Sequence, residues 1–168
     1  MAMAAPAAAL AISVRSVRPD DRERILGALT YTSENTYYRR FHAPKHRFTE
    51  RELAHLTQVD GHNHIALIAT ERDRPDRLVA IARLVRDAGA PAEAELAITV
   101  HDPYQRRGIG SHMLALLVEA AREHGITCLH ANIQFENRAM IRLFQKVLPQ
   151  AELIGRDGGV GEYAAEIA

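Results

Sequence analysis

Residues 100–111 read VHDPYQRRGIGS, and they decide how the rest of the chain is interpreted. An apolar, strand-like run ends at Val100, two glycines follow close together at Gly108 and Gly110, and a helical pattern begins after them. At such a junction successive backbone N–H groups point to one spot, and the start of a helix adds about half a positive charge. Glycine also lets the main chain approach a ligand closely. The segment therefore predicts a phosphate-binding loop.

The two common phosphate-binding loops do not fit these residues. A Rossmann fingerprint requires a third glycine at the position of Met113, and a Walker loop requires Gly-Lys followed by Ser or Thr. Both nucleotide-binding folds are therefore disfavoured. A Gly-x-Gly pair alone also occurs in ordinary structural turns, so the elements around the loop must decide its role.

Three strand-like runs precede the loop. They cover residues 64–69, 78–85 and 93–100, and short polar turns separate them. In the third run the apolar residues recur with period two, which is typical of a strand with one buried face. Because short connections join antiparallel strands, the sequence predicts three antiparallel strands ahead of the loop.

The remaining segments alternate between helices and strands. The clearest boundary is at Thr49 and Glu52, whose spacing is that of a capping box at the start of a helix. The expected elements are a strand at 11–17, helices at about 18–29, 32–41 and 49–58, a helix that ends near Gly125, a strand at 126–133, a helix at 138–147, and two weak strands around Leu153 and Tyr163.

The composition fits one globular domain. The chain has 168 residues, of which 47% are hydrophobic and 25% charged, and a typical domain has about 150 residues. We expect residues 11–168 to form a single domain behind a disordered, alanine-rich tail at 1–10. The 21 basic and 21 acidic residues cancel, so the chain lacks the positive field that favours nucleic acid. No apolar stretch reaches the ~18 residues of a membrane span.

The cysteine and histidine content bounds the remaining chemistry. Cys128 is the only cysteine, so no internal disulfide forms, and its apolar neighbours predict a small buried side chain in a reducing compartment, the cytoplasm by default. No Lys or Arg precedes Arg15, so the positive region of a signal peptide is missing. The nine histidines are scattered, and we expect no metal site.

The loop also carries a family resemblance. Gln105–Gly110 is similar to the Gln/Arg-x-x-Gly-x-Gly/Ala signature of the GNAT superfamily of acyl-CoA-dependent N-acetyltransferases, and residues 136–144 resemble that family's second cofactor segment. Residues 37–41, 52–60 and 94–98 look more specifically like the catalytic domain of bacterial Pat-type protein lysine acetyltransferases. The resemblance implies an α/β (α+β) fold with a mixed, mostly antiparallel sheet of six or seven strands flanked by helices. It also implies a cofactor cleft between the splayed fourth and fifth strands.

The same resemblance implies a binding mode for acetyl-CoA. Main-chain groups of Ile98 and Val100 would pair with the pantetheine arm like an added strand, and the N–H near Ile98 would polarise the thioester carbonyl. Asn137 would contact the same arm, although it would serve equally well as the N-cap of the helix that follows it. The backbone N–H groups implied to bind the pyrophosphate belong to Gln105, Arg106, Arg107, Gly108, Ile109, Gly110 and Ser111.

The reaction requires a base, because a lysine amine has a pKa of about 10.4 and forming the free amine at neutral pH costs ~4 kcal/mol. The resemblance implies that Glu95 is this base. A solvated strand face is the plainer interpretation of Glu95, Glu93 is the second candidate, and His130 is expected to be a packed core histidine. Phe144 stands where many GNAT enzymes have a tyrosine that protonates the leaving thiolate, so no general acid is assigned.

The acceptor is the least defined partner. The Pat-type resemblance implies a protein lysine, with acyl-CoA synthetases among the expected partners. A local basic cluster would then face an acidic partner surface, although such clusters are more commonly a solvated surface; it comprises Arg39, Arg40, His42, Lys45, His46 and Arg47. Two alternatives remain open, namely acetylation of a small amine and a non-catalytic acyl-CoA sensor. Acyl-chain length and oligomeric state are not predicted.

Overall fold

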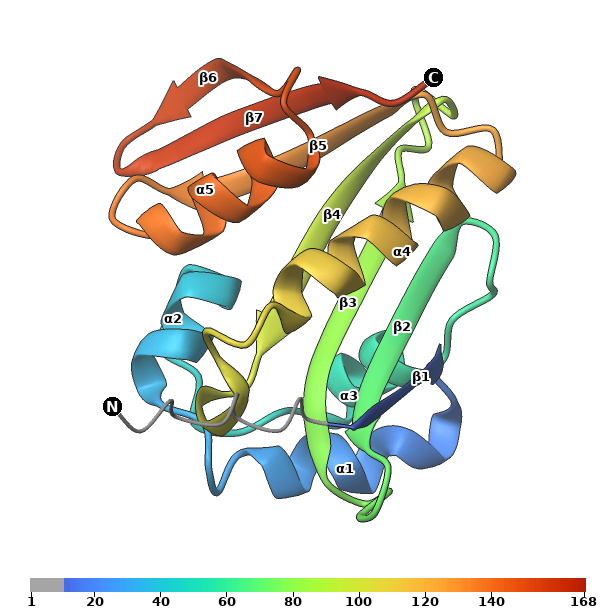
Figure 1. Ribbon diagram of the computed structural model, residues 1–168, viewed down its shortest axis with the longest axis vertical. Helices are drawn as coiled ribbons and strands as arrows, with labels where there is room; N and C mark the ends of the chain where they lie inside the picture. Colours follow the sequence, from blue (N-terminus) through green and yellow to red (C-terminus); the bar gives the residue numbers. More distant parts are fainter. Residues whose placement is uncertain (1–10) are drawn as a thin grey trace, which may run out of the picture.

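One seven-stranded sheet organises the protein (Figure 1). The computed structural model describes residues 11–168, and the predicted tail at 1–10 lies outside the described residues. Across the sheet the strands follow the order β1-β2-β3-β4-β5-β7-β6, and every neighbouring pair is antiparallel except β4 and β5. This confirms the expected mixed, mostly antiparallel sheet. The strands are β1 Ile12–Ser16, β2 His64–Glu71, β3 Leu78–Arg86, β4 Glu93–Val100, β5 Cys128–Gln134, β6 Glu152–Asp157 and β7 Val160–Glu166.

Local signals in the sequence account for most helix boundaries. The predicted capping box is confirmed, because Glu52 N donates to Thr49 Oγ1 at 3.2 Å and Thr49 N donates to the Glu52 carboxylate at 2.7 Å.

Within residues 11–168, no helix combines the length and the apolar character of a membrane span. The helices are α1 Arg22–Ala28, α2 Glu34–Phe41, α3 Glu50–Thr57, α4 Ile109–Glu123 and α5 Arg138–Val147, with 3₁₀ turns η1 Pro19–Asp21 and η2 Asp102–Tyr104.

Two apolar cores lie on the two faces of the sheet. Helix α4 crosses one face of β2, β3 and β4 (Figure 1) and contributes Met113, Leu114 and Leu117, all with no exposed surface, to the larger core. Helices α1 and α3 cover the other face and form the smaller core around Ile68. Neighbouring residues of β2 divide between the two cores, since successive side chains of a strand point to opposite faces.

A buried ionic cluster fastens β1 to the turn that begins α1. The Asp21 carboxylate has no exposed surface, and both of its oxygens accept hydrogen bonds from Arg15, at 2.7 and 2.8 Å. Arg18 N donates to the same carboxylate at 2.7 Å, and Arg24 Nη1 donates at 3.1 Å. Burial acts to raise the pKa of Asp21, but these hydrogen bonds and charges outweigh it and hold the pKa below its usual range.

The sheet divides between β4 and β5. The two strands pair in parallel at only three positions, Glu93 with Cys128, Ala94 with Leu129 and Glu95 with His130. Beyond Glu95, β4 continues beside β3, and β5 continues beside β7. This confirms the expected splay of the fourth and fifth strands.

Two expectations for β5 are wrong. Cys128 and His130 are partly exposed rather than packed into a core. Strand β5 begins at Cys128, and alternation places Leu129 and Ala131 in the core beside α4 while Cys128 and His130 lie on the other face. On that face His130 contacts Glu93 and Glu162 instead of apolar side chains.

Candidate active site

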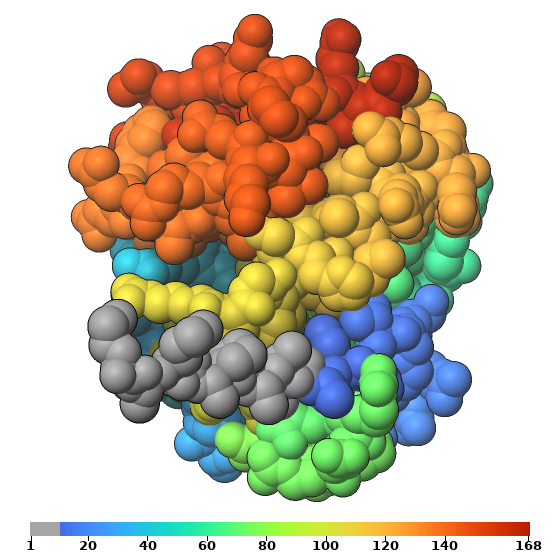
Figure 2. Space-filling view, viewed as in Figure 1, coloured from blue at the N-terminus to red at the C-terminus, as the bar shows by residue number. Residues whose placement is uncertain are grey.

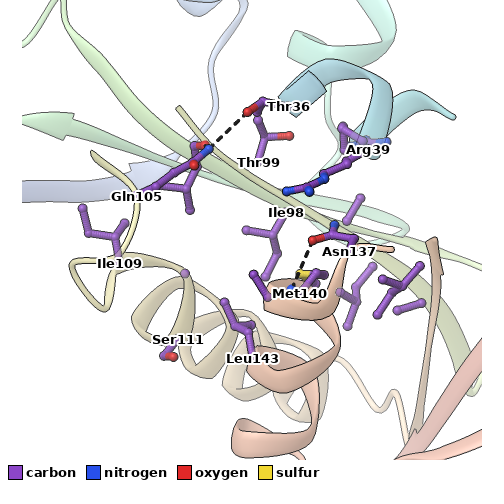
Figure 3. A pocket seen from close by; sticks show the side chains of 18 of the residues that line it. Thr36, Arg39, Ile98, Thr99, Gln105, Ile109, Ser111, Asn137, Met140 and Leu143 are labelled. Atoms are coloured by element: carbon purple, nitrogen blue, oxygen red, sulfur yellow. Dashed lines mark hydrogen bonds between the residues drawn. The ribbon is translucent and has the colours of Figure 1, made fainter. Parts of the chain in front are cut away.

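A cleft of about 390 Å³ opens where β4 and β5 separate. In the space-filling view, the light blue surface of α2 is visible between the orange surface of the C-terminal part and the yellow surface near residue 105 (Figure 2). Helix α5, the loop before α4 and helix α2 complete the walls (Figure 3). The lining residues are Thr36, Arg39 and Arg40 from α2, residues 96–100 of β4, Tyr104, Gln105, Arg106, Gly108, Ile109, Gly110 and Ser111 from the loop and α4, residues 131–133 of β5, and Asn137, Ala139, Met140 and Leu143 at α5.

The loop before α4 combines two left-handed residues with a helix N-terminus that faces the cleft. Arg106 and Gly108 both adopt left-handed conformations, with φ of 61° and 79°. The first intrahelical bond of α4 runs from His112 N to Gly108 O, so the N–H groups of residues 109–111 precede the hydrogen-bonded part of the helix and meet the cleft. The structure thus brings the predicted loop residues to the cleft, with the exception of Arg107.

Gly110 has a different role from Gly108. A Cβ atom at Gly110 would lie 2.5 Å from Leu143 Cδ1, whereas a Cβ at Gly108 would meet nothing within 4 Å. Glycine at position 110 therefore permits the close approach of α4 and α5, while glycine at position 108 permits the left-handed turn.

The cleft-facing edge of β4 presents main-chain polar groups. His101 N donates to Val79 O on β3 at 3.0 Å, so His101 points its backbone groups towards β3. Because these groups alternate in direction along a strand, Ile98 and Val100 point theirs towards the cleft. Gln105 Nε2 donates to Val100 O at 2.9 Å from that side. The strand therefore has the edge that the sequence analysis expected at Ile98 and Val100.

Three hydrogen bonds fix α2 against the other wall of the cleft. Thr32 Oγ1 lies 2.7 Å from His101 Nδ1, and Ser33 N donates to Asp102 Oδ1 at 2.8 Å. Gln105 Nε2 donates to Thr36 Oγ1 at 3.2 Å (Figure 3). These bonds tie α2 to the segment after β4, and Arg39 extends from α2 into the cleft (Figure 3).

Of the predicted basic cluster, the structure brings only Arg39 and Arg40 to the cleft. Arg39 and Arg40 line it, whereas Lys45 pairs with Glu52 and His46 lies 3.4 Å from Glu34. Burial lowers the pKa of Arg40 to about 10, and the charge of Glu95 acts in the opposite direction. The cleft therefore has a cationic wall.

Glu95 lies beyond the end of this cleft. Its side chain is exposed on β4, at the last pairing position with β5, and it is outside the set of lining residues. Its charge acts on Arg40, which does line the cleft. The predicted base is thus a neighbour of the cleft wall. Phe144, which stands where many GNAT enzymes have a tyrosine, is a buried core residue, and its ring centroid lies 6.4 Å from that of Tyr163.

The sequence analysis did not identify two buried basic side chains, Arg83 and His101. Arg83 on β3 is 4% exposed, donates to Leu56 O at 3.2 Å, and has no ion pair with any carboxylate of the described chain. Burial, aided by the charge of Arg40, lowers its pKa to about 9. Burial also lowers the pKa of His101 to about 4. Arg83 and His101 line a cavity of about 30 Å³ that shares Arg40 and Thr99 with the cleft. Their apolar neighbours in sequence gave no signal of this grouping.

Asn137 is both the N-cap of α5 and part of the cleft. Its Oδ1 accepts a hydrogen bond from Met140 N at 3.3 Å (Figure 3), and the residue lines the cleft. The N-cap role is therefore present in the structure, while contact with a cofactor stays a prediction.

Substitutions at Asn137 should separate these two roles. We expect Asn137→Ala to lower the free energy of unfolding by about 1 kcal/mol, and Asn137→Ser to preserve it because serine caps helices equally well. Chemical denaturation measures this difference. If Asn137 also contacts acetyl-CoA, both variants raise KM for acetyl-CoA; an unchanged KM in the serine variant would leave the residue as a cap only.

Comparison with known proteins identifies a family and relatives that are similar to this chain. The model of the acetyltransferase (GNAT) family matches residues 27–148. Acetyltransferase Pat of Mycolicibacterium smegmatis is 34% identical over 134 residues, which is 80% of this chain; the chain spans 40% of the length of that relative.

Solved structures show the same similarity. The GNAT domain of S. lividans PAT superposes with a TM-score of 0.82 at 30% identity, over 91% of this chain and 89% of that one. The structure of yncA from Salmonella typhimurium with its cofactor acetyl-CoA superposes with a TM-score of 0.67 over 94% of this chain and 95% of that one. Its identity of 19% shows likeness of fold alone.

Proposed function

This chain belongs to the GNAT family of acetyltransferases, and on that premise we propose that it transfers the acetyl group of acetyl-CoA to the side-chain amine of a protein lysine. The observation that carries the proposal is the meeting, in one cleft, of the loop before α4 with the main-chain edge of β4. The loop offers N–H groups to a diphosphate, and the strand edge offers an amide-bearing arm the partners of a neighbouring strand.

In this proposal the backbone of residues 105–111 binds the pyrophosphate, Ile98 and Val100 pair with the pantetheine arm, and Asn137 contacts the same arm. The Ile98 N–H polarises the thioester carbonyl. The acceptor nitrogen attacks the carbonyl carbon, Glu95 takes the amine proton directly or through water, and the C–S bond breaks to release CoA as a thiolate. A thiol has a pKa of roughly 8.5, so it leaves without a general acid.

The cationic wall supports a protein acceptor over a polyamine. Arg39 and Arg40 would repel a small polycation from the cleft, and they would attract an acidic surface around a target lysine. The resemblance of residues 37–41, 52–60 and 94–98 to Pat-type protein lysine acetyltransferases supports the same choice, and acyl-CoA synthetases are the first proteins to test.

Gly108 provides a test of the cofactor site. We expect Gly108→Ala to weaken acetyl-CoA binding about tenfold, because the left-handed turn costs an alanine about 1 kcal/mol or more and distorts the loop. Gly125→Ala is the matched control: its φ of 73° is similar, and a Cβ there also meets nothing within 4 Å. Calorimetry should show weaker binding in the first variant only, while both lose stability; equal affinities in the two variants would contradict the assigned loop.

The acceptor is identified by incubating the protein with labelled acetyl-CoA and two panels, one of acyl-CoA synthetases and other proteins, and one of small amines. Release of free CoA and mass spectrometry of the products report the reaction. Acetylated lysines in a protein support the proposal. Acetylation of small amines alone would replace it with the small-amine alternative, and binding of acetyl-CoA without CoA release would replace it with the sensor alternative.

A further inference from the structure

Four polar side chains from three strands meet outside the cleft, where β4 and β5 still pair. His130 Nε2 lies 2.6 Å from a Glu93 carboxylate oxygen and 3.6 Å from Cys128 Sγ. His130 Nδ1 lies 3.2 Å from Glu162 Oε1. Ligand atoms of Glu93, Cys128 and His130 all lie within 4.8 Å of one another, and all three residues are partly exposed. An ion can therefore reach the group from solvent.

We propose that Glu93, Cys128 and His130 bind a Zn²⁺ ion. A thiolate, an imidazole and a carboxylate are the donors that Zn²⁺ prefers, and hard cations such as Mg²⁺ and Ca²⁺ prefer sites made of oxygen alone. This proposal replaces the expectation of no metal site, which rested on the scatter of the histidines along the sequence and did not consider donors on separate strands.

The separation of Cys128 and His130 fits tetrahedral zinc. Zn–S and Zn–N bonds of about 2.3 and 2.0–2.1 Å, at a tetrahedral angle, place the sulfur and the nitrogen about 3.6 Å apart. The observed separation of Cys128 Sγ and His130 Nε2 is 3.6 Å. The Glu93 oxygen would move back by about 0.7 Å from its present hydrogen bond to reach the same geometry. A water molecule completes the fourth position, as at other sites with three protein ligands.

Glu162 supplies an independent argument. A histidine that binds a metal through one ring nitrogen commonly donates the N–H of the other to a carboxylate, which fixes the ring and its tautomer. Glu162 Oε1 lies 3.2 Å from Nδ1, within the distance of such a hydrogen bond, and Nε2 faces Glu93 and Cys128. Burial and the charges of Glu93 and Glu166 raise the pKa of Cys128, so binding would displace the thiol proton to solvent as the Zn–S bond forms.

The position of the ion suggests its effect. It would link Glu93 on β4 to Cys128 and His130 on β5 at the pairs where the sheet is about to divide. Because these donors come together only in the folded chain, binding would stabilise the fold by mass action. This proposal is independent of the proposed acetyl transfer.

The test is a titration of the tag-free, metal-depleted full chain with ZnCl₂ by calorimetry, and with CoCl₂ by absorption spectroscopy. We expect one Zn²⁺ per chain, no binding of Mg²⁺, and a thiolate-to-cobalt charge-transfer band. Glu162→Gln should weaken binding about 10- to 100-fold, and Cys128→Ser and His130→Asn should weaken it further. His62→Asn is the control, since His62 lies in the turn before β2 and its ring centroid is 5.8 Å from that of His124; this variant should bind as the wild type does.

Two measurements on the wild type keep the test valid if a variant fails to fold. Zn²⁺ at a hundredfold excess over its Kd should raise Tm by about 5–10 °C. Zn²⁺ but not Mg²⁺ should slow the alkylation of Cys128 by iodoacetamide. Absence of stoichiometric binding, binding that survives Cys128→Ser, or unprotected Cys128 in the presence of Zn²⁺ would each overturn the proposal.

Discussion

Replacing Glu95 with glutamine is expected to lower kcat by about 10²- to 10³-fold at neutral pH, within the range that general-base catalysis contributes. Glutamine keeps the shape of the side chain and removes its ability to accept the proton of the attacking amine. Because Glu95 is exposed on β4 and lies outside the cleft lining, KM for acetyl-CoA should change little. Steady-state kinetics on an identified acceptor, between pH 6 and pH 10, measures both effects.

Glu93→Gln is the informative comparison, because Glu93 lies two residues away on the same strand and is the second candidate for the base. Measuring both variants in metal-free buffer prevents the proposed zinc ion from confounding the result. Glu119→Gln, on the exposed face of α4, controls for loss of a surface charge and should leave kcat unchanged. A larger loss of kcat in Glu93→Gln than in Glu95→Gln would reassign the base, and an unchanged pH profile in both would remove a carboxylate base from the mechanism.

Asp21→Asn is expected to lower the free energy of unfolding by about 3–5 kcal/mol, the range found when one partner of a buried ion pair is removed. The amide would keep its volume, but Arg15 and Arg24 would lose the charge that both now contact. Asp20 is exposed in the same turn, so Asp20→Asn should change the free energy of unfolding by less than about 0.5 kcal/mol. Urea denaturation of both variants gives the comparison.

The Asp21 carboxylate should also affect how the free energy of unfolding depends on pH under acidic conditions. Since folding lowers the pKa of Asp21, its contribution is fully present above the pKa of the unfolded chain and is lost as pH falls through the folded value. The wild type should therefore lose this stability on acidification, and Asp21→Asn should not. Equal free energies of unfolding of the two proteins at pH 7 would show that the ionic cluster around Asp21 does not stabilise the fold.

Local patterns carried most of the prediction of the fold. Period-two alternation in residues 93–100 and the capping box at Thr49 depend only on neighbours in sequence, and both are confirmed. The splay after Glu95 was expected from the family resemblance rather than from the residues themselves. The expected burial of Cys128 was wrong. The apolar residues around it fall on both faces of the strand, so the sequence did not show which face the core covers.

The groupings that the sequence did not reveal are long-range. Arg40 and Arg83 come from α2 and β3 and meet around a small cavity, and no spacing along the chain predicts their proximity. His130 lies between Glu93 and Glu162 only because β5 pairs with β4 on one side and with β7 on the other. A search for metal-ligand motifs compares residues that are close in sequence. In this group the donors are close in space because of the order of the strands in the sheet.

The direction of the backbone in β4 has a consequence for how much this site tolerates change. Ile98 and Val100 offer the cleft their amides and carbonyls, while their side chains pack against the core beneath α4. Every residue except proline provides the same amide and carbonyl. In the proposed binding mode, recognition at this edge would not depend on side-chain identity, and exchange among Val, Leu and Ile at these two positions would alter packing while leaving the main-chain contacts to the pantetheine arm intact.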